Sequence, residues 1–146
     1  MKTDDFLHQL DEPSVVKAIT DAELQTSGEI RVFVSEAEIE AADVIPRAKA
    51  RFEKLGMTAT RDRNAVLLYF VPKSQKFAII GDTGIHEKCG QPFWDEVAAE
   101  MHRLFQEQKF TDAIVGTVQK VGTVLARHFP VRPDDTNELP NRVERG

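Results

Sequence analysis

The sequence predicts an α/β protein, a three-layer α/β/α sandwich with a mixed central β-sheet. Segments with apolar residues at helical spacing alternate with short apolar segments, 29–35, 65–71 and 76–80, that have the composition of strands. A helical segment separates the first two strands, as in a right-handed parallel unit, whereas a tight turn joins the last two as an antiparallel hairpin. The expected order is helix, strand, helix, strand, strand, helix, helix, with the helices covering the sheet.

The first helix and the first strand have clear local signals. Asp11 or Ser14 can cap the helix, and residues 26–28 end it. The apolar face of this helix consists of Val15, Ile19 and Ala22. In the strand 29–35 the apolar residues Ile30, Val32 and Val34 occupy alternate positions, which indicates one well-buried face.

The second helix is expected to begin after Asp43, to tolerate Pro46 in its first turn and to end before Gly56. Its apolar stripe consists of Ile45, Ala48, Phe52 and Leu55. The strand 65–71 is apolar nearly throughout, which is typical of a central strand covered on both faces. Residues 72–75 then turn the chain back into the third strand.

Two helices complete the predicted fold. Pro92 suits the first turn of the third helix, and Thr111 is the expected N-cap of the fourth. The stripe of the third helix consists of Trp94, Val97, Ala98, Met101 and Phe105. The stripe of the fourth helix consists of Ile114, Val118, Val121 and Leu125. At this spacing Trp94 is expected to belong to the core rather than to a ligand platform.

The composition limits the classes of function. At 146 residues, with 41% hydrophobic and 29% charged residues, the chain has the size and composition of one soluble domain. A net charge of -5 supplies no overall field for nucleic acid or an anionic membrane, so we expect neither partner. Without a signal peptide or an apolar run of about 20 residues, we expect a cytoplasmic protein without direct membrane insertion. Cys89, the only cysteine, fits a reducing compartment.

The chain is expected to divide near Pro130. Residues 1–130 contain all of the predicted helices and strands. Residues 131–146 combine prolines and many charges with few large apolar groups, which cannot bury enough surface to fold alone. We therefore expect a flexible C-terminal tail over these residues.

Polar loops should meet at one end of the predicted sheet. The two parallel strands start at that end and the antiparallel strand finishes there, so the loops 26–29, 60–64 and 81–84 converge. The candidate ligand-binding residues are Gly81, Thr83, Gly84, Arg63, Asn64, Ser27 and Glu29. Asp82 and Asp62 are the candidate metal ligands, and together with Arg61 they are the candidate catalytic residues.

These groups suit two kinds of ligand. Carboxylate and carbonyl oxygens favour a hard cation such as Ca²⁺ or Mg²⁺. Arginines and glycine amides favour phosphate or carboxylate, and a divalent ion bridging to a phosphate would use both sets. A structural role stays open, because Gly-Asp-Thr-Gly also suits a tight turn, and Arg61 and Arg63 can pair with Asp62 and Glu29 on the surface.

Other signatures are weak or absent. Asp82-Thr83-Gly84 is the tripeptide of aspartic peptidases, but those enzymes need two aspartates about 3 Å apart in a β-rich setting. The chain has no second copy of the tripeptide, which argues against a peptidase. It also has no Walker loop, no G-x-G-x-x-G and no G-x-S-x-G, so no nucleotide cofactor is expected.

Several segments, in their order and spacing, resemble the TPM-domain family. They are TSGEIRVFV after the first helix, RNAVLLYF in the central strand, FAIIGDTGI followed by FWDEV, and HFP after the last helix. The likeness spans about residues 12–130, and NELP in the tail resembles the short cytosolic bacterial-type members.

The resemblance implies an α/β/α sandwich and an acidic site at one end of the sheet. Some members of the family bind calcium or another divalent ion through loop residues, at the positions of Asp62 with Asn64 and of Asp82 with Thr83. Plant members are described as acid phosphatases. The larger secreted members carry an acidic motif ahead of the first helix, and this chain lacks it.

Two hypotheses of function from different classes remain. In the first, the loops bind a divalent cation or a phosphate-bearing ligand, with weak phosphatase activity through a metal-activated water. In the second, the protein is a non-enzymatic interaction module, accessory to a membrane-associated assembly. It would then dock an unidentified protein partner through the tail or the basic stretch 49–63. The residues do not decide whether the protein is an enzyme.

Overall fold

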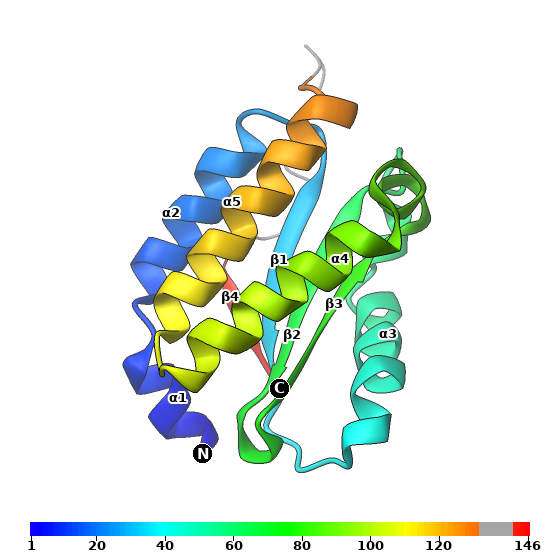
Figure 1. Cartoon of the computed structure of the whole chain (residues 1–146). Coiled ribbons are helices and arrows are strands. Elements are labelled where there is room, and N and C mark those ends of the chain that lie inside the picture. Colours follow the sequence, from blue (N-terminus) through cyan, green and yellow to red (C-terminus); the bar gives the residue numbers. More distant parts are fainter. Residues whose placement is uncertain (132–141) are drawn as a thin grey trace.

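A four-stranded mixed sheet forms the centre of the protein, and the computed structural model describes residues 1–131 and 142–146 (Figure 1). The strands are β1 (Glu29–Val34), β2 (Ala65–Val71), β3 (Lys76–Gly81) and β4 (Val143–Arg145). They lie in the order β3-β2-β1-β4, with β1 parallel to β2 and β4, and with β3 antiparallel to β2. The predicted parallel unit and the predicted hairpin are therefore confirmed.

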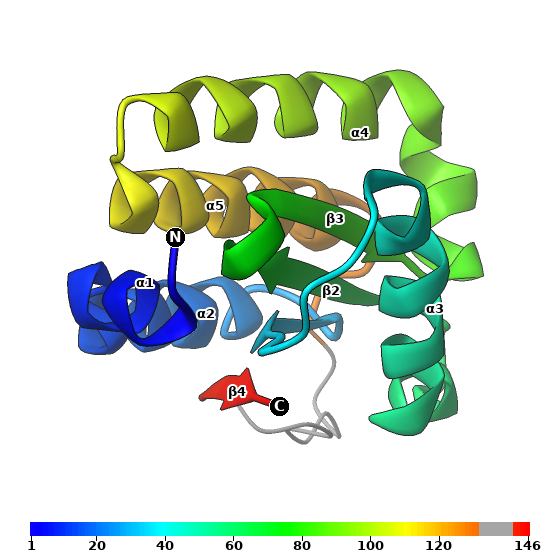
Figure 2. The same ribbon diagram turned by 90° about the horizontal axis from the view of Figure 1, so that it is seen from below.

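The helices cover the two faces of this sheet. They are α1 (Thr3–Gln9), α2 (Glu12–Glu23), α3 (Val44–Lys54), α4 (Thr83–Gln106) and α5 (Phe110–His128). The short 3-10 helices are η1 (Ala41–Asp43), η2 (Met57–Ala59) and η3 (Pro72–Ser74). Figure 2 shows α4 and α5 together on one side of the strands.

Two hydrophobic cores show that the fold has three layers. The larger core joins α1, α2, α4 and α5 to one face of the sheet through residues such as Val32, Leu68 and Leu125. The smaller core joins α3 to the other face through Phe52 and Leu67. Strand β2 contributes alternate side chains to the two cores and is buried along its whole length, as expected for a central strand. The predicted α/β/α sandwich is confirmed.

Strand β4 was not predicted. Its residues belong to the segment that the sequence assigns to a flexible tail, yet Val143–Arg145 pair with Val32–Val34 of β1. The backbone N of Gly146 also donates a hydrogen bond to the carbonyl of Val34 at 3.1 Å. Residues 143–145 are thus part of the sheet, while residues 132–141 of the predicted tail lie outside the described residues.

Helix α4 starts earlier than predicted. It begins directly after Asp82 rather than near Pro92. Gly90 has a φ of 73° and interrupts the helical backbone, so Pro92 lies in the first turn after this kink, where its fixed φ is favourable. Trp94, Val97 and Met101 are buried, as the predicted stripe requires.

Other differences concern helix ends and faces. Helix α1 was not predicted. Lys109 rather than Thr111 occupies the N-cap of α5, and the Oγ1 atom of Thr111 instead accepts a hydrogen bond from the backbone N of Asp11 at 3.0 Å. In α3, Ile45 is 52% exposed, and Val44 takes its place on the buried face because Val44, Ala48 and Phe52 follow one another at helical spacing.

Candidate functional site

The loops 26–29, 60–64 and 81–84 lie together at one end of the sheet, and we call them the three-loop cluster. The backbone N of Gly84 donates to the carbonyl of Arg63 at 2.8 Å, and the backbone N of Asp82 donates to the carbonyl of Ala65 at 3.0 Å. The amide of Asn64 contacts the hydroxyl of Ser27 at 3.3 Å. The convergence that strand directions predicted is therefore present, and hydrogen bonds link the three loops.

Asp82 is held in place by partners from the loops 60–64 and 81–84. Its carboxylate accepts hydrogen bonds from Nε and Nη2 of Arg63 at 2.7 and 2.9 Å. It also accepts one from the backbone N of Thr83 at 2.8 Å and so caps α4. The side chain of Asp82 is 5% exposed and that of Arg63 is 47% exposed, so a buried carboxylate faces a half-exposed guanidinium. The hydrogen bonds to Asp82 and its negative charge raise the pKa of Arg63.

The sequence did not predict the ion pair between Arg63 and Asp82. It allowed Arg61 and Arg63 to pair with Asp62 and Glu29, whereas the structure pairs Arg63 with Asp82. A bidentate pair between side chains 19 positions apart depends on how the hairpin and the loop 60–64 fold together, and local spacing carries no such signal.

The backbone of Arg63 has an uncommon conformation. Its φ of 51° lies in the left-handed region, which non-glycine residues rarely adopt. Gly84 packs against this turn so closely that an added Cβ would lie 2.6 Å from the carbonyl oxygen of Arg63 and would also contact the carbonyl oxygen of Asp62. Only glycine fits at position 84, and the loop 60–64 is consequently held against the start of α4.

Two glycine amides of the cluster, those of Gly28 and Gly84, form hydrogen bonds within the protein, and Gly81 is closely packed. Gly84 donates to Arg63, and Gly28 donates to the hydroxyl of Thr26 at 3.0 Å. Gly81 packs on Trp94, where an added Cβ would lie 2.5 Å from the indole. An anion that used the amides of Gly28 or Gly84 would have to compete with these hydrogen bonds.

The remaining candidate residues differ in exposure. Ser27, Glu29 and Asn64 are buried, with 9%, 3% and 1% exposure. Asp62 is half-buried, while Arg61 and Thr83 are exposed. In the loop 60–64, Thr60 adds a feature that the sequence did not indicate. Its hydroxyl is buried and has no hydrogen-bond partner among the described residues.

The donor set fits a hard cation only in part. Within residues 1–131 and 142–146, no group of three or more His, Cys, Asp or Glu side chains is placed to hold a metal ion. A cation bound by Asp82 and Asp62 would therefore need carbonyl or hydroxyl oxygens to complete its shell. Ca²⁺ accepts such ligands readily, and the buried hydroxyl of Thr60 lies in the same loop as Asp62. All of these donors are oxygens, which argues against a zinc site.

Comparison with known proteins assigns the family. A family model described as the TPM domain matches residues 1–124. The chain belongs to the TPM-domain family. No curated protein matches this TPM domain. No helix in the part of the TPM domain that the structure describes has the length and apolar character needed to cross a membrane.

Two solved structures support the fold of this TPM domain. The BA42 protein from the psychrophilic bacterium Bizionia argentinensis is 38% identical, with a TM-score of 0.82 over 92% of each chain. The N-terminal domain of the cg2496 protein from Corynebacterium glutamicum is 12% identical, with a TM-score of 0.58. That match covers 90% of this chain and 75% of the other, and it concerns the fold alone.

Proposed function

We propose that this TPM domain binds a divalent cation at the three-loop cluster, with the carboxylates of Asp82 and Asp62 among the ligands. The observation that carries the proposal is the buried carboxylate of Asp82, held between the loops 60–64 and 81–84. A buried carboxylate needs a positive partner, and here the partner is a guanidinium that is itself half exposed.

A cation at Asp82 would compete with Arg63 for the carboxylate oxygens. The side chain of Arg63 is 47% exposed, so it can turn towards solvent, and the cation then replaces it as the positive partner of Asp82. Thr83 would still donate to Asp82 through its backbone N, so α4 would keep its cap. Arg63 is therefore the residue whose side chain we expect to move when a cation binds.

Displacement of Arg63 from Asp82 by a cation would also allow a phosphate-bearing ligand to bind beside the cation. A guanidinium released from Asp82 presents several donors that match phosphate oxygens, and Arg61 is exposed in the same loop. A bound divalent cation would supply Lewis-acid activation of water or phosphate. Weak phosphatase activity is thus a further part of the proposal, in which Arg61 and Arg63 neutralise charge on the phosphate.

A titration with CaCl₂ or MgCl₂, followed by backbone NMR, tests cation binding. We expect the amides of residues 28, 62 and 82 to shift together with one dissociation constant. Asp82→Asn and Asp62→Asn should each weaken binding by about tenfold or more. Asp95→Asn is the matched control, because Asp95 is an exposed aspartate on α4 outside the cluster. Absent shifts, or shifts with unrelated midpoints, would contradict the proposal.

Turnover of an aryl phosphate tests the enzymatic part separately. If the cluster hydrolyses phosphate esters, turnover should require the cation and should be lost in Asp82→Asn. Cation binding without turnover would show that the protein binds a cation but does not hydrolyse this substrate. Turnover that is unchanged in Asp82→Asn would show that Asp82 has no role in the hydrolysis.

The alternative, a non-enzymatic interaction module, also stays a prediction. Part of its proposed basic surface is used within the protein: Arg63 pairs with Asp82, and the guanidinium of Arg51 lies 4.4 Å from the ring centre of Phe33. Residues 142–146, proposed as part of a docking tail, lie in and beside the sheet. These contacts leave fewer basic side chains of the stretch 49–63 available for docking. We therefore prefer the cation-binding hypothesis to the interaction-module hypothesis.

A further inference from the structure

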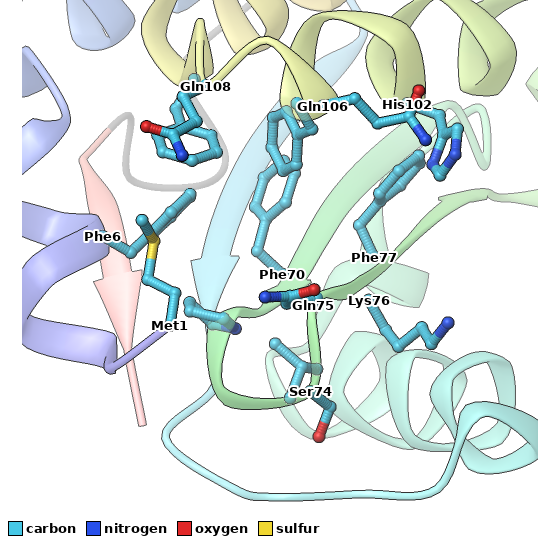
Figure 3. Close-up of a pocket in the computed structure, with 14 residues that line it drawn as sticks. Met1, Phe6, Phe70, Ser74, Gln75, Lys76, Phe77, His102, Gln106 and Gln108 are labelled. Atoms are coloured by element: carbon cyan, nitrogen blue, oxygen red, sulfur yellow. The ribbon is translucent and has the colours of Figure 1, made fainter.

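A cavity of about 410 Å³ lies at the other end of the sheet from the three-loop cluster (Figure 3). Strand β2 starts at the cluster and ends at this cavity, and β3 returns from it, so the two sites are separated by the length of a strand. The cavity lies between α1, the β2–β3 hairpin and the turn from α4 to α5. Its volume falls within the range of about 300 to 1,000 Å³ that small-molecule sites occupy.

Phenylalanine rings form the floor of the cavity. They belong to Phe6, Phe70, Phe77, Phe105 and Phe110. Neighbouring ring centres are 5.2 to 6.3 Å apart, and several pairs meet edge to face. Phe6, Phe70 and Phe110 are buried, whereas Phe77 and Phe105 are half-buried. The ring surface that Phe77 and Phe105 leave uncovered is available to a flat apolar ligand.

Side chains with amide and imidazole groups lie around these rings. His102 and Gln106 are one turn apart on α4, and Figure 3 shows their side chains side by side above Phe77. Gln75 lies on the hairpin side of Phe70, and Gln108 lies at the turn that follows α4. Each glutamine amide offers a donor and an acceptor next to each other. Lys76 also lines the cavity, but its side chain extends away from the rings in Figure 3.

Among the described residues, no aspartate or glutamate lines the cavity, although acidic residues outnumber lysines and arginines in the full chain by 24 to 19. The carboxylate of Glu107, in the turn beside the cavity, accepts a hydrogen bond from Nη1 of Arg103 at 2.9 Å. Close to the rings, the described part of the rim thus offers amide and imidazole donors and acceptors, and the charged group of Lys76 lies away from them.

We propose that this cavity is a second binding site, for a small neutral aromatic ligand with an amide-type edge, such as an aromatic carboxamide or a free nucleobase. The ring of the ligand packs on Phe77 and Phe105. Its donor and acceptor atoms pair with the amide of Gln106 and the imidazole of His102, the pairing that glutamine forms with an adenine edge. The site is independent of cation binding at the three-loop cluster.

NMR titration with nicotinamide tests this site, and nicotinate is the matched control of the same shape. We expect saturable shifts at residues 70, 77, 102 and 106, with a dissociation constant on the order of millimolar for so small a ligand. Nicotinate, which has a negative charge and no donor on its carboxylate, should bind at least about fivefold more weakly. Equal or tighter binding of nicotinate would overturn the proposal, as would the absence of saturable shifts.

Variants at the rim locate the contact. Gln106→Ala and His102→Ala remove exposed side chains from α4 and should each weaken nicotinamide binding about fivefold. Gln119→Ala, an exposed glutamine on α5, should not change it. Phe77→Leu keeps the apolar floor but removes the ring, and it should weaken binding while the NMR spectrum stays that of the folded protein. Unchanged affinity in all three rim and floor variants would contradict the assignment.

Discussion

Nη2 of Arg31 in β1 donates a hydrogen bond to Oε1 of Glu144 in β4 at 2.6 Å, and the two side chains are 7% and 16% exposed. This ion pair joins residues 113 positions apart and connects the C-terminal strand to the body of the sheet. Nε of Arg31 is buried and has no hydrogen-bond partner among the described residues. The hydrogen bond to Glu144 is therefore important for the buried guanidinium of Arg31.

Glu144→Ala should reduce the free energy of unfolding by about 3 kcal/mol, because it leaves the guanidinium of Arg31 buried without this carboxylate. Chemical denaturation of the variant and the native protein measures the difference. Glu107→Ala is the control: Glu107 pairs with Arg103 on the surface, and its loss should change stability by less than about 1 kcal/mol. Equal small effects for both variants would show that β4 is not held by this pair.

The same pair predicts a dependence of stability on pH. Burial by itself would raise the pKa of Glu144, but hydrogen bonds from Arg31 and Arg142 and their charges outweigh it, so the pKa lies below the ordinary value of 4.5. The stabilisation from this lowered pKa is present above about pH 4.5 and is lost as the pH falls through the folded-state value. Glu144→Gln should therefore lose stability relative to the native protein at pH 7, and the difference should shrink towards pH 3. A difference that is constant with pH would contradict this assignment.

Gly84→Ala should disturb the three-loop cluster, because the new Cβ would collide with backbone carbonyl oxygens of Asp62 and Arg63. We expect a loss of at least about 1 kcal/mol in stability, together with weaker cation binding. Gly116→Ala is the matched change, since nothing lies within 4 Å of its added Cβ on α5. This control should stabilise the protein by roughly 0.5 to 1 kcal/mol through helix propensity. Thermal unfolding and the calcium titration together measure both effects.

Arg63→Gln tests whether a cation and the guanidinium compete for Asp82. Without the guanidinium, the buried carboxylate of Asp82 lacks its positive partner, so the variant should be less stable than the native protein when no cation is added. Added CaCl₂ should then raise its melting temperature more than that of the native protein. Arg103→Gln, which removes an exposed ion pair on α4, should respond to CaCl₂ as the native protein does. If CaCl₂ stabilises both variants equally, Arg63 and the cation do not share Asp82.

Cys89 should react slowly with alkylating reagents. Burial raises the pKa of its thiol above the ordinary value of 9.0, and Sγ contacts the carbonyl of Ile85 at 3.2 Å. At pH 8 the thiolate is then a small fraction of the thiol, so iodoacetamide should modify the folded protein more slowly than the denatured one. Mass spectrometry of timed samples gives the two rates, and faster modification of the folded protein would contradict the prediction.

The sequence predicted those parts of the fold that depend on local pattern. Apolar periodicity located the buried faces of α2 and α5, and the continuous apolar run predicted that β2 is central. Strand directions alone predicted that the three loops converge. The kink at Gly90 and the short strand β4 were missed, because one glycine and a three-residue strand carry little periodic signal.

The candidate site was likewise predicted only in part from the sequence. The sequence supplied its carboxylates, arginines and glycines, since composition and spacing are enough to name polar loops at the ends of predicted strands. Only the tertiary structure decided that Arg63 pairs with Asp82 and that Gly84 packs on the loop 60–64.

The sequence by itself therefore determined the family resemblance, the layers and the end of the sheet where the loops meet. The tertiary structure decided the partners: Arg63 for Asp82, Glu144 for Arg31, and the ring-floored cavity at the opposite end. The physical reason is that secondary structure follows from interactions between residues a few positions apart. Ion pairs and cavities depend instead on the register and packing of segments that are distant in the chain.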